Sequence, residues 1–177
     1  MKLFKAIVFL FVFCQSFSQN KQSNFSNFTQ FEITVPFGLN EQKELDEIRS
    51  KPWYKPSGLG TKLGYGYIFH NWIGISSHSG LDLNWDSKLI SVPIYAQLSI
   101  SPKIADKTRL ITQFGFGQSF VLGRGNLSGN YYKARIGFLN NDDFSLFIDS
   151  SFYGFKFNQQ SLNTISLGLC IFSFDSS

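Results

Sequence analysis

The sequence predicts an all-β fold, an eight-stranded antiparallel transmembrane up-and-down β-barrel. Three observations predict it. Apolar residues alternate with small or polar residues in blocks of about ten, which is the length of a membrane-crossing strand. About eight such blocks follow one another after residue 27, and a segment typical of an export signal precedes them. Strict alternation lets each strand turn one face to lipid and the other to a lumen.

The N-terminal segment is interpreted as a cleaved signal peptide, residues 1–19, and residues 20–177 as the barrel domain. A short basic start is followed by an apolar run, Ala6 to Cys14, and then by the small residues of Ser16-Phe17-Ser18. This order of regions is typical of a secretory signal. The apolar run has about nine residues, whereas a membrane helix requires about twenty.

Composition supports a membrane barrel and argues against several classes of site. Charged residues make up 16% of the chain and aromatic residues 18%, with 21 phenylalanines, whereas a typical soluble domain has about 25% charged residues. Cleavage would remove Lys2 and Lys5 and reduce the net charge from +4 to about +2, which is too low for a nucleic-acid surface. Cys170 would be the one remaining cysteine, so no intramolecular disulfide and no zinc-type cysteine cluster can form. No metal or cofactor is expected.

Eight strands are expected where the alternation is regular, separated by Gly, Asn and Asp, which tolerate the positive φ of hairpin turns. The expected ranges are Phe28–Phe37, Leu59–Phe69, Trp72–Trp85, Lys88–Ile100, Thr108–Leu122, Asn130–Leu139, Asp143–Phe155 and Asn163–Phe174. An even number of strands places both termini at one end, which is periplasmic in bacterial outer-membrane barrels.

The connections then divide between two sides. The long polar segment Asn40–Ser57 falls outside the cell, and a short amphipathic helix through Leu39, Leu45 and Ile48 is expected there. The loops near Asp86, Gly123–Gly129 and Asn158–Gln160 fall on the same outer side. The turns at His70-Asn71, Ser101–Lys107 and Asn140–Asp142 fall in the periplasm.

Every charge in the middle of an expected strand lies on the less apolar face. These residues are Glu32, Lys62, Asp82, Lys133, Arg135 and Asp149. A basic side chain in lipid at mid-depth would cost about 2–4 kcal/mol. Three acids and three bases can instead neutralise one another in a lumen that eight strands leave just wide enough for side chains. We therefore expect a structural charge network, with Tyr95, Phe147 and Tyr153 beside it and no open pore.

Aromatic residues gather near the ends of the expected strands, where rings favour the membrane–water interface. They are Trp53, Tyr54, Trp72, Trp85, Tyr131, Tyr132, Phe172 and Phe174.

Motifs for chemistry are weak. Ser76 and His78 share a strand face with Asp82, which would suit a lipid-modifying barrel hydrolase. Residues two apart in a strand diverge, however, so direct pairing of serine and histidine is not expected. Gly123-Arg124-Gly125 lacks the strand-to-helix context of a phosphate loop, and the acidic run after Asn40 lacks the spacing of a calcium loop. No catalytic residue is therefore assigned, although a lipid-modifying enzyme stays open.

Three segments carry a resemblance to a known family: Phe17-Ser18-Gln19, Ser91-Val92-Pro93-Ile94-Tyr95 and Ile165-Ser166-Leu167-Gly168-Leu169. In these patterns the chain resembles small outer-membrane β-barrel proteins of Bacteroidetes-type bacteria and is similar in plan to OmpA/OmpX-like eight-stranded barrels. The resemblance implies insertion into the outer membrane of a Gram-negative cell envelope by the barrel-assembly machinery. It implies no catalytic residues.

Two functional classes remain open. The favoured one is an outer-membrane barrel with a structural, adhesive or surface-contact role through its external loops, whose partners are outer-membrane lipid and an unknown surface molecule. The alternative is a soluble exported barrel of lipocalin type that turns its apolar face inward around a small apolar ligand. A water-facing surface would be rich in Lys and Glu, whereas the less apolar face here is mostly Gly, Ser, Gln and Thr.

Overall fold

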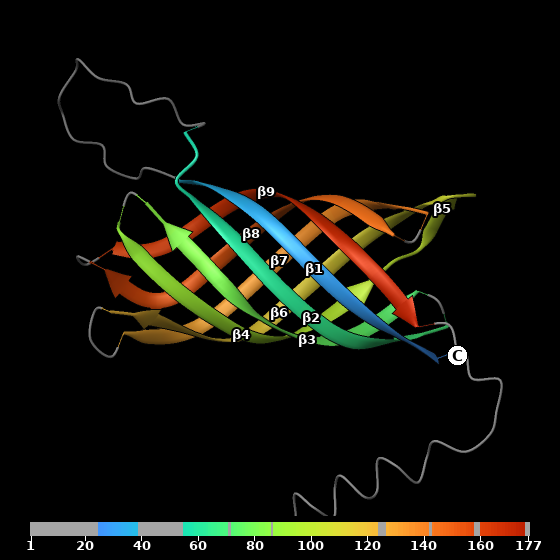
Figure 1. Cartoon of the computed structure of the whole chain (residues 1–177), viewed down its shortest axis with the longest axis horizontal. Helices are drawn as coiled ribbons and strands as arrows, with labels where there is room; N and C mark the ends of the chain where they lie inside the picture. The colour runs from blue at the N-terminus through green and yellow to red at the C-terminus, as the bar shows by residue number, and fades with distance from the viewer. Residues whose placement is uncertain are drawn as a thin grey trace, which may run out of the picture.

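A sheet of antiparallel strands closes on itself in a computed structural model of the chain (Figure 1). The structure describes residues 25–38, 55–70, 72–85, 87–123, 127–141, 143–157 and 160–175. The expected signal peptide, the helix through Leu39, Leu45 and Ile48, and the aromatic residues Trp53 and Tyr54 lie outside these ranges. Among the described residues, no helix is long and apolar enough to cross a membrane.

Each expected strand corresponds to an observed one of 12–16 residues. The long strands are β1 (Phe25–Gly38), β2 (Gly58–Phe69), β3 (Ile73–Asn84), β4 (Leu89–Ile100), β6 (Thr108–Leu122), β7 (Ser128–Asn140), β8 (Phe144–Phe157) and β9 (Gln160–Asp175). A ninth, short strand, β5 (Lys103–Ala105), lies in the segment expected to be a plain turn.

The long strands pair in an up-and-down order with two closing contacts. Neighbours in the chain pair antiparallel, β1 also pairs with β9, and β4 pairs with β6 past the short β5. Every long strand therefore has a partner on both sides. This confirms the predicted closed eight-stranded antiparallel barrel, an architecture that leaves no free sheet edge.

The connections gather at two ends in the predicted groups (Figure 1). The start of β1, the end of β9, the turn between β2 and β3, and β5 share one end, called here the terminal end. The opposite end, where β1 ends and β2 begins, is called the loop end. Turn residues His70 and Asn141 adopt positive φ of 50° and 52°, and Gly123 adopts 81°, as hairpin turns require.

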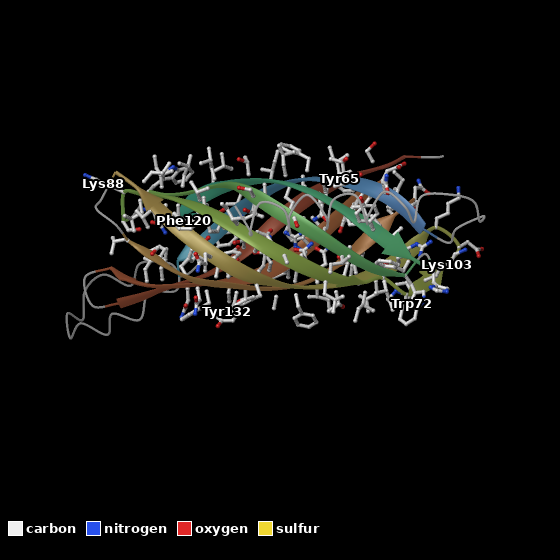
Figure 2. The ribbon with its side chains drawn as sticks, turned by 90° about the horizontal axis from the view of Figure 1, so that it is seen from below. Tyr65, Trp72, Lys88, Lys103, Phe120 and Tyr132 are labelled. Carbon is white, nitrogen blue, oxygen red and sulfur yellow. The ribbon has the colours of Figure 1, made fainter. Side chains whose placement is uncertain are left out.

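Side chains alternate between the outside and the lumen along every long strand. Leu63, Ile75 and Phe116 point outward with half or more of their surface exposed, whereas Gln30 and Glu32 point inward and have no exposed surface. Tyr65, Phe120 and Tyr132 stand on the outer surface in Figure 2. Apolar groups therefore face outward and polar groups inward, which is the reverse of what the lipocalin alternative requires.

Two apolar clusters occupy the lumen. The phenylalanine cluster, toward the terminal end, is formed by Phe28, Ile111, Leu139, Phe147, Cys170 and Phe172, with Ile68 and Phe174 packed against it. The tyrosine cluster, toward the loop end, is formed by Leu89, Tyr95, Val121, Tyr131, Tyr153 and Phe155, with Leu127 and Leu162 packed against it.

Candidate functional site

The charged residues singled out in the sequence meet inside the barrel. Glu32 comes from β1, Lys62 from β2, Asp82 from β3, Lys133 and Arg135 from β7, and Asp149 from β8. All are at least nine-tenths buried in the lumen except Asp82, which is partly buried. Their strands bring them inward because each occupies the lumen side of the alternating pattern.

Four of them form a compact quartet that links β1 to β7 and β8 across the lumen. Lys133 Nζ lies 2.8 Å from Glu32 Oε2 and 3.2 Å from Asp149 Oδ2. Arg135 donates to Glu32 and lies 3.1 Å from Asp149 Oδ2. Arg135 and Asp149 are direct neighbours across β7 and β8, whereas Glu32 reaches them from β1 on another wall. Each cation therefore contacts both acids, and their charges balance.

The remaining two charges form a separate pair toward the loop end. Lys62 Nζ donates to Asp82 Oδ1 at 2.5 Å, and the hydroxyl of Tyr153 donates to Asp82 Oδ2 at 2.6 Å. The tyrosine cluster thus supplies a hydrogen bond to a carboxylate as well as apolar packing. The barrel tolerates the burial of this ion pair because both carboxylate oxygens of Asp82 accept a hydrogen bond.

Lumen-facing glycines provide the space for the larger groups. A Cβ at Gly168 would overlap the ring of Phe147, its neighbour across β8 and β9, and a Cβ at Gly64 would overlap the ring of His78. Phe147 in turn lies under the guanidinium of Arg135, whose Cζ is 3.4 Å from the ring centroid. Such a contact adds cation–π attraction to the ion pairs.

His78 makes contacts that the sequence did not predict. Its Nε2 lies 2.8 Å from Ser76 Oγ and 3.1 Å from Gln97 Nε2, and its ring stacks on Tyr95. The expectation that Ser76 and His78 diverge is therefore wrong, because the imidazole is long enough to fold back along its own strand. Since the amide nitrogen of Gln97 can only donate, His78 Nε2 accepts from it, and Nδ1 carries the proton in this arrangement.

The expected third member of that group, Asp82, does not face His78. The acid nearest to its Nδ1 is Glu32, at 3.5 Å, which is too long for a hydrogen bond. Glu32 is at the same time engaged by Lys133 and Arg135. The serine, histidine and glutamate have the order of a catalytic triad, but all three side chains are buried and the carboxylate is already neutralised.

Sequence reasoning missed the lumen amides. Gln30 donates to Glu32 at 2.7 Å, and Gln113 links the charged layer to β4 by accepting from Arg135 at 3.0 Å and donating to Ser99 at 3.1 Å. The inward position of these glutamines could have identified them, because a long polar side chain in a narrow lumen needs partners.

The aromatic residues near strand ends divide between two environments. Trp72, Trp85 and Tyr132 are exposed on the outside, where interfacial rings are expected. Tyr131 and Phe172 instead point inward and are buried, and Phe174 packs against the phenylalanine cluster. The interfacial expectation is wrong for these three, because strand alternation decides the direction of a side chain whatever its depth. Tyr95, Phe147 and Tyr153 are buried in the lumen.

Among the described residues, no group of three His, Cys, Asp or Glu side chains could hold a metal ion. Cys170 is a buried free thiol. The site is therefore a network of buried ion pairs and hydrogen bonds between two apolar clusters.

The fold and lumen define a transmembrane β-barrel of the small eight-stranded type. The outer membrane protein Ail of Yersinia pestis, in a phospholipid bilayer nanodisc, is similar with a TM-score of 0.50 and 14% identity over 83% of this chain and 99% of that one. The N-terminal β-barrel domain of Pseudomonas aeruginosa OprF is similar with a TM-score of 0.51 and 8% identity over 85% and 98%. No protein-family model and no curated protein matches the sequence. The predicted OmpA/OmpX-like plan is thus supported at the level of the fold.

Proposed function

We propose that this protein resides in the outer membrane of a Gram-negative bacterium and has a structural or surface-contact role, exerted through the loops at the loop end. The observation that carries the proposal is the contrast between the two faces of the barrel wall. Its outer face is apolar, and its charged side chains meet within a filled lumen.

Membrane residence is supported by the outward side chains. Leu63, Ile136 and Ile148 each expose more than half of their surface in the middle of a strand. A continuous apolar belt of this kind is costly in water but suits hydrocarbon. The proposal includes insertion by the barrel-assembly machinery, contact with outer-membrane lipid and, from the resemblance in sequence, a Bacteroidetes-type host.

A filled lumen supports a role other than transport. The quartet of Glu32, Lys133, Arg135 and Asp149 spans the lumen, and an apolar cluster lies on either side of it. To cross the barrel, an ion or solute would have to break buried ion pairs. Breaking one such pair costs roughly 3–5 kcal/mol when the buried charges gain no new partner. We therefore propose that no solute crosses and that function lies in the loops.

A lipid-modifying hydrolase is the second candidate, favoured by the 2.8 Å contact between Ser76 Oγ and His78 Nε2. The burial of both side chains supports the non-catalytic role instead, since a lipid ester would have to enter the lumen to reach the hydroxyl. An alkyl fluorophosphonate that labels the folded protein, and fails to label Ser76→Ala, would establish the hydrolase.

The proposal is tested with the full chain in its own envelope and in liposomes. We expect it in the detergent-extracted envelope fraction, with gel mobility that changes on heating, and we expect liposomes containing it to conduct no more than empty ones. An epitope placed between Asn40 and Ser57 should bind antibody on intact cells, whereas one at Asp106 should require permeabilised cells. Recovery in the soluble fraction, or stable single-channel conductance, would contradict the proposal.

A further inference from the structure

The pairing of β3 with β4, which are neighbours in the barrel wall (Figure 1), is interrupted within the two strands. Gly80 and Leu81 form no pair with Pro93 and Val92, which lie opposite them, although the register is the same on both sides of the break. No residue is inserted there, so the break is not a β-bulge. Proline cannot donate to a ladder and is rare inside a sheet for that reason. Pro93 therefore accounts for the break.

The break leaves one backbone carbonyl without its ladder donor. Ser101 N donates to Trp72 O at 2.7 Å, and hydrogen-bonded pairs recur at every second residue of an antiparallel ladder. Gly80 therefore faces Pro93 at a hydrogen-bonded position, where proline has no N–H. Within the described ranges, the side chains that donate to backbone carbonyls reach other residues. The carbonyl of Gly80 thus has no donor in the described part of the chain.

This unpaired carbonyl lies in the part of the wall that faces hydrocarbon. β3 begins after Trp72 and ends before Trp85, whose exposed rings are expected at the two membrane surfaces. Gly80 lies between them, and its outward neighbours Leu81 and Ile94 are about half exposed. A backbone polar group without a partner is costly in hydrocarbon, because no water replaces the missing hydrogen bond. A donor from outside the chain would remove this cost.

Hydroxyl groups stand beside the unpaired carbonyl on the outer face of the same strand. Ser77 and Ser79 point outward from β3 and are exposed, and within the described ranges neither hydroxyl makes a hydrogen bond. Ala96, opposite Ser77 on β4, is also small, whereas Leu63, opposite Ser79 on β2, is 61% exposed. Small outward side chains let another backbone approach closely in a membrane. This face therefore combines unused donors, an unused acceptor and room for a second wall.

We propose that β3 and β4 form a dimer interface at which a second copy of this chain docks in the membrane. A twofold axis along the membrane normal places equivalent residues of the two copies at the same depth. The Ser79 hydroxyl of each copy then donates to the Gly80 carbonyl of the other, and replaces the donor that Pro93 lacks. The inference rests on the membrane residence proposed above and goes beyond it, because contact through external loops requires no second copy.

Distances between spin labels test both the dimer and its interface without altering the contact residues. Lys88 lies in the turn between β3 and β4, whereas Asn163 is exposed on β9, across the barrel from β4. Lys88→Cys and Asn163→Cys, each carrying a nitroxide, are made in the full chain and reconstituted in phosphatidylcholine vesicles with a large excess of lipid. Cys170 is buried and is present in both variants.

Dipolar electron resonance should then find the two Lys88 labels closer together than the two Asn163 labels. The reason is that a dimer through β3 and β4 brings the first pair of labels toward the axis and leaves the second pair on the outer sides. A signal without any dipolar coupling, or labels at Asn163 as close as those at Lys88, would overturn the proposal.

Two substitutions identify the hydrogen bond itself. Ser79→Ala removes the donor, and Pro93→Ala supplies an N–H within the chain that occupies the acceptor. Either should lower the dimer association constant about tenfold, because two symmetric hydrogen bonds are lost at about threefold each. Ser150→Ala makes the same change as Ser79→Ala on the outer face of β8 and should leave the constant unchanged.

The double variant separates this hydrogen bond from a general effect on folding. Ser79→Ala combined with Pro93→Ala should associate as weakly as either single variant, because both remove the same two bonds. Additive losses, or no loss in Ser79→Ala, would refute the contact and would mean that water or another group satisfies the carbonyl.

The fate of the dimer is distinguishable from that of the proposed function. A chain that inserts into vesicles, keeps its heat-dependent gel mobility and shows no dipolar coupling would overturn the dimer alone. A chain that does not insert would contradict membrane residence and the dimer together.

Discussion

The two apolar clusters of the lumen are similar in size and differ in how they meet the charged layer. The tyrosine cluster provides hydroxyl groups, and Tyr153 donates to Asp82 while Tyr131 lies 3.0 Å from Ser151 Oγ. The phenylalanine cluster touches the charged layer through a ring face, that of Phe147 under Arg135. One end of the lumen is thus tied to the charges by directed hydrogen bonds and the other by packing. Substitutions should therefore affect the two ends through different mechanisms.

The largest effect is expected in the layer between the clusters. Glu32→Gln removes the acid shared by Lys133 and Arg135 and leaves both cations on Asp149 alone. Leaving a buried charge without its partner costs about 3–5 kcal/mol. The free energy of unfolding, measured by urea titration in detergent micelles, should fall by this amount.

The matched control combines Glu32→Gln with Lys133→Met, which restores the balance of charge. Most of the lost stability should return in the double variant, because Arg135 and Asp149 can then pair with each other. A double variant as unstable as Glu32→Gln alone would mean that charge balance does not hold this layer together.

The next largest effect is expected at the phenylalanine cluster. Leu139→Ala removes a buried side chain, 3% exposed, from the packed end of the lumen, and such truncations cost about 2–5 kcal/mol in cavity and transfer terms. The free energy of unfolding in micelles measures it. Leu122→Ala, on the exposed outer face near a strand end, is the control and should change stability far less.

A smaller effect is expected at the tyrosine cluster. Tyr153→Phe keeps the ring and removes the hydrogen bond to Asp82, which still has Lys62. A hydrogen bond to a charged group contributes about 1.5–3 kcal/mol. Combined with Asp82→Asn, the tyrosine substitution should cost much less than it does alone. If the two costs simply add, the hydroxyl and the carboxylate are not coupled.

The smallest effect is expected at His78. Ser76→Ala removes one of two groups that contact Nε2 and leaves the Gln97 amide in place. The loss should be about 1 kcal/mol, the net value of an ordinary hydrogen bond, and the substitution should not change the gel mobility of the folded barrel. A loss above that of Tyr153→Phe would mean that the serine and histidine support the charged layer directly.

The alternating pattern was sufficient to predict which side of the wall each residue faces. Parity alone predicts that Glu32, Lys62 and Arg135 face the lumen, and all three are buried there. The short strand β5 was not predicted, because Pro102 interrupts the pattern without ending the pairing. Tyr131 and Phe172 face the lumen because of their parity in the strand, which a position near a strand end does not change.

The alternating pattern does not predict which side chains contact one another within the lumen. Glu32 meets Lys133 and Arg135, which are about a hundred residues away in the chain, and nothing in any one strand encodes which wall lies opposite. Closure of the barrel fixes which strands face one another across the lumen. The quartet, the pair of Lys62 with Asp82 and the contact of Ser76 with His78 all depend on this arrangement.

The sequence by itself determined that this chain forms a barrel of eight strands with its charges turned inward, because alternation and turn chemistry are local properties of the chain. Only the tertiary structure decided which acid meets which base and where a glycine makes room for a ring. These depend on distances across the lumen, which are fixed when β4 pairs with β6 and β1 pairs with β9.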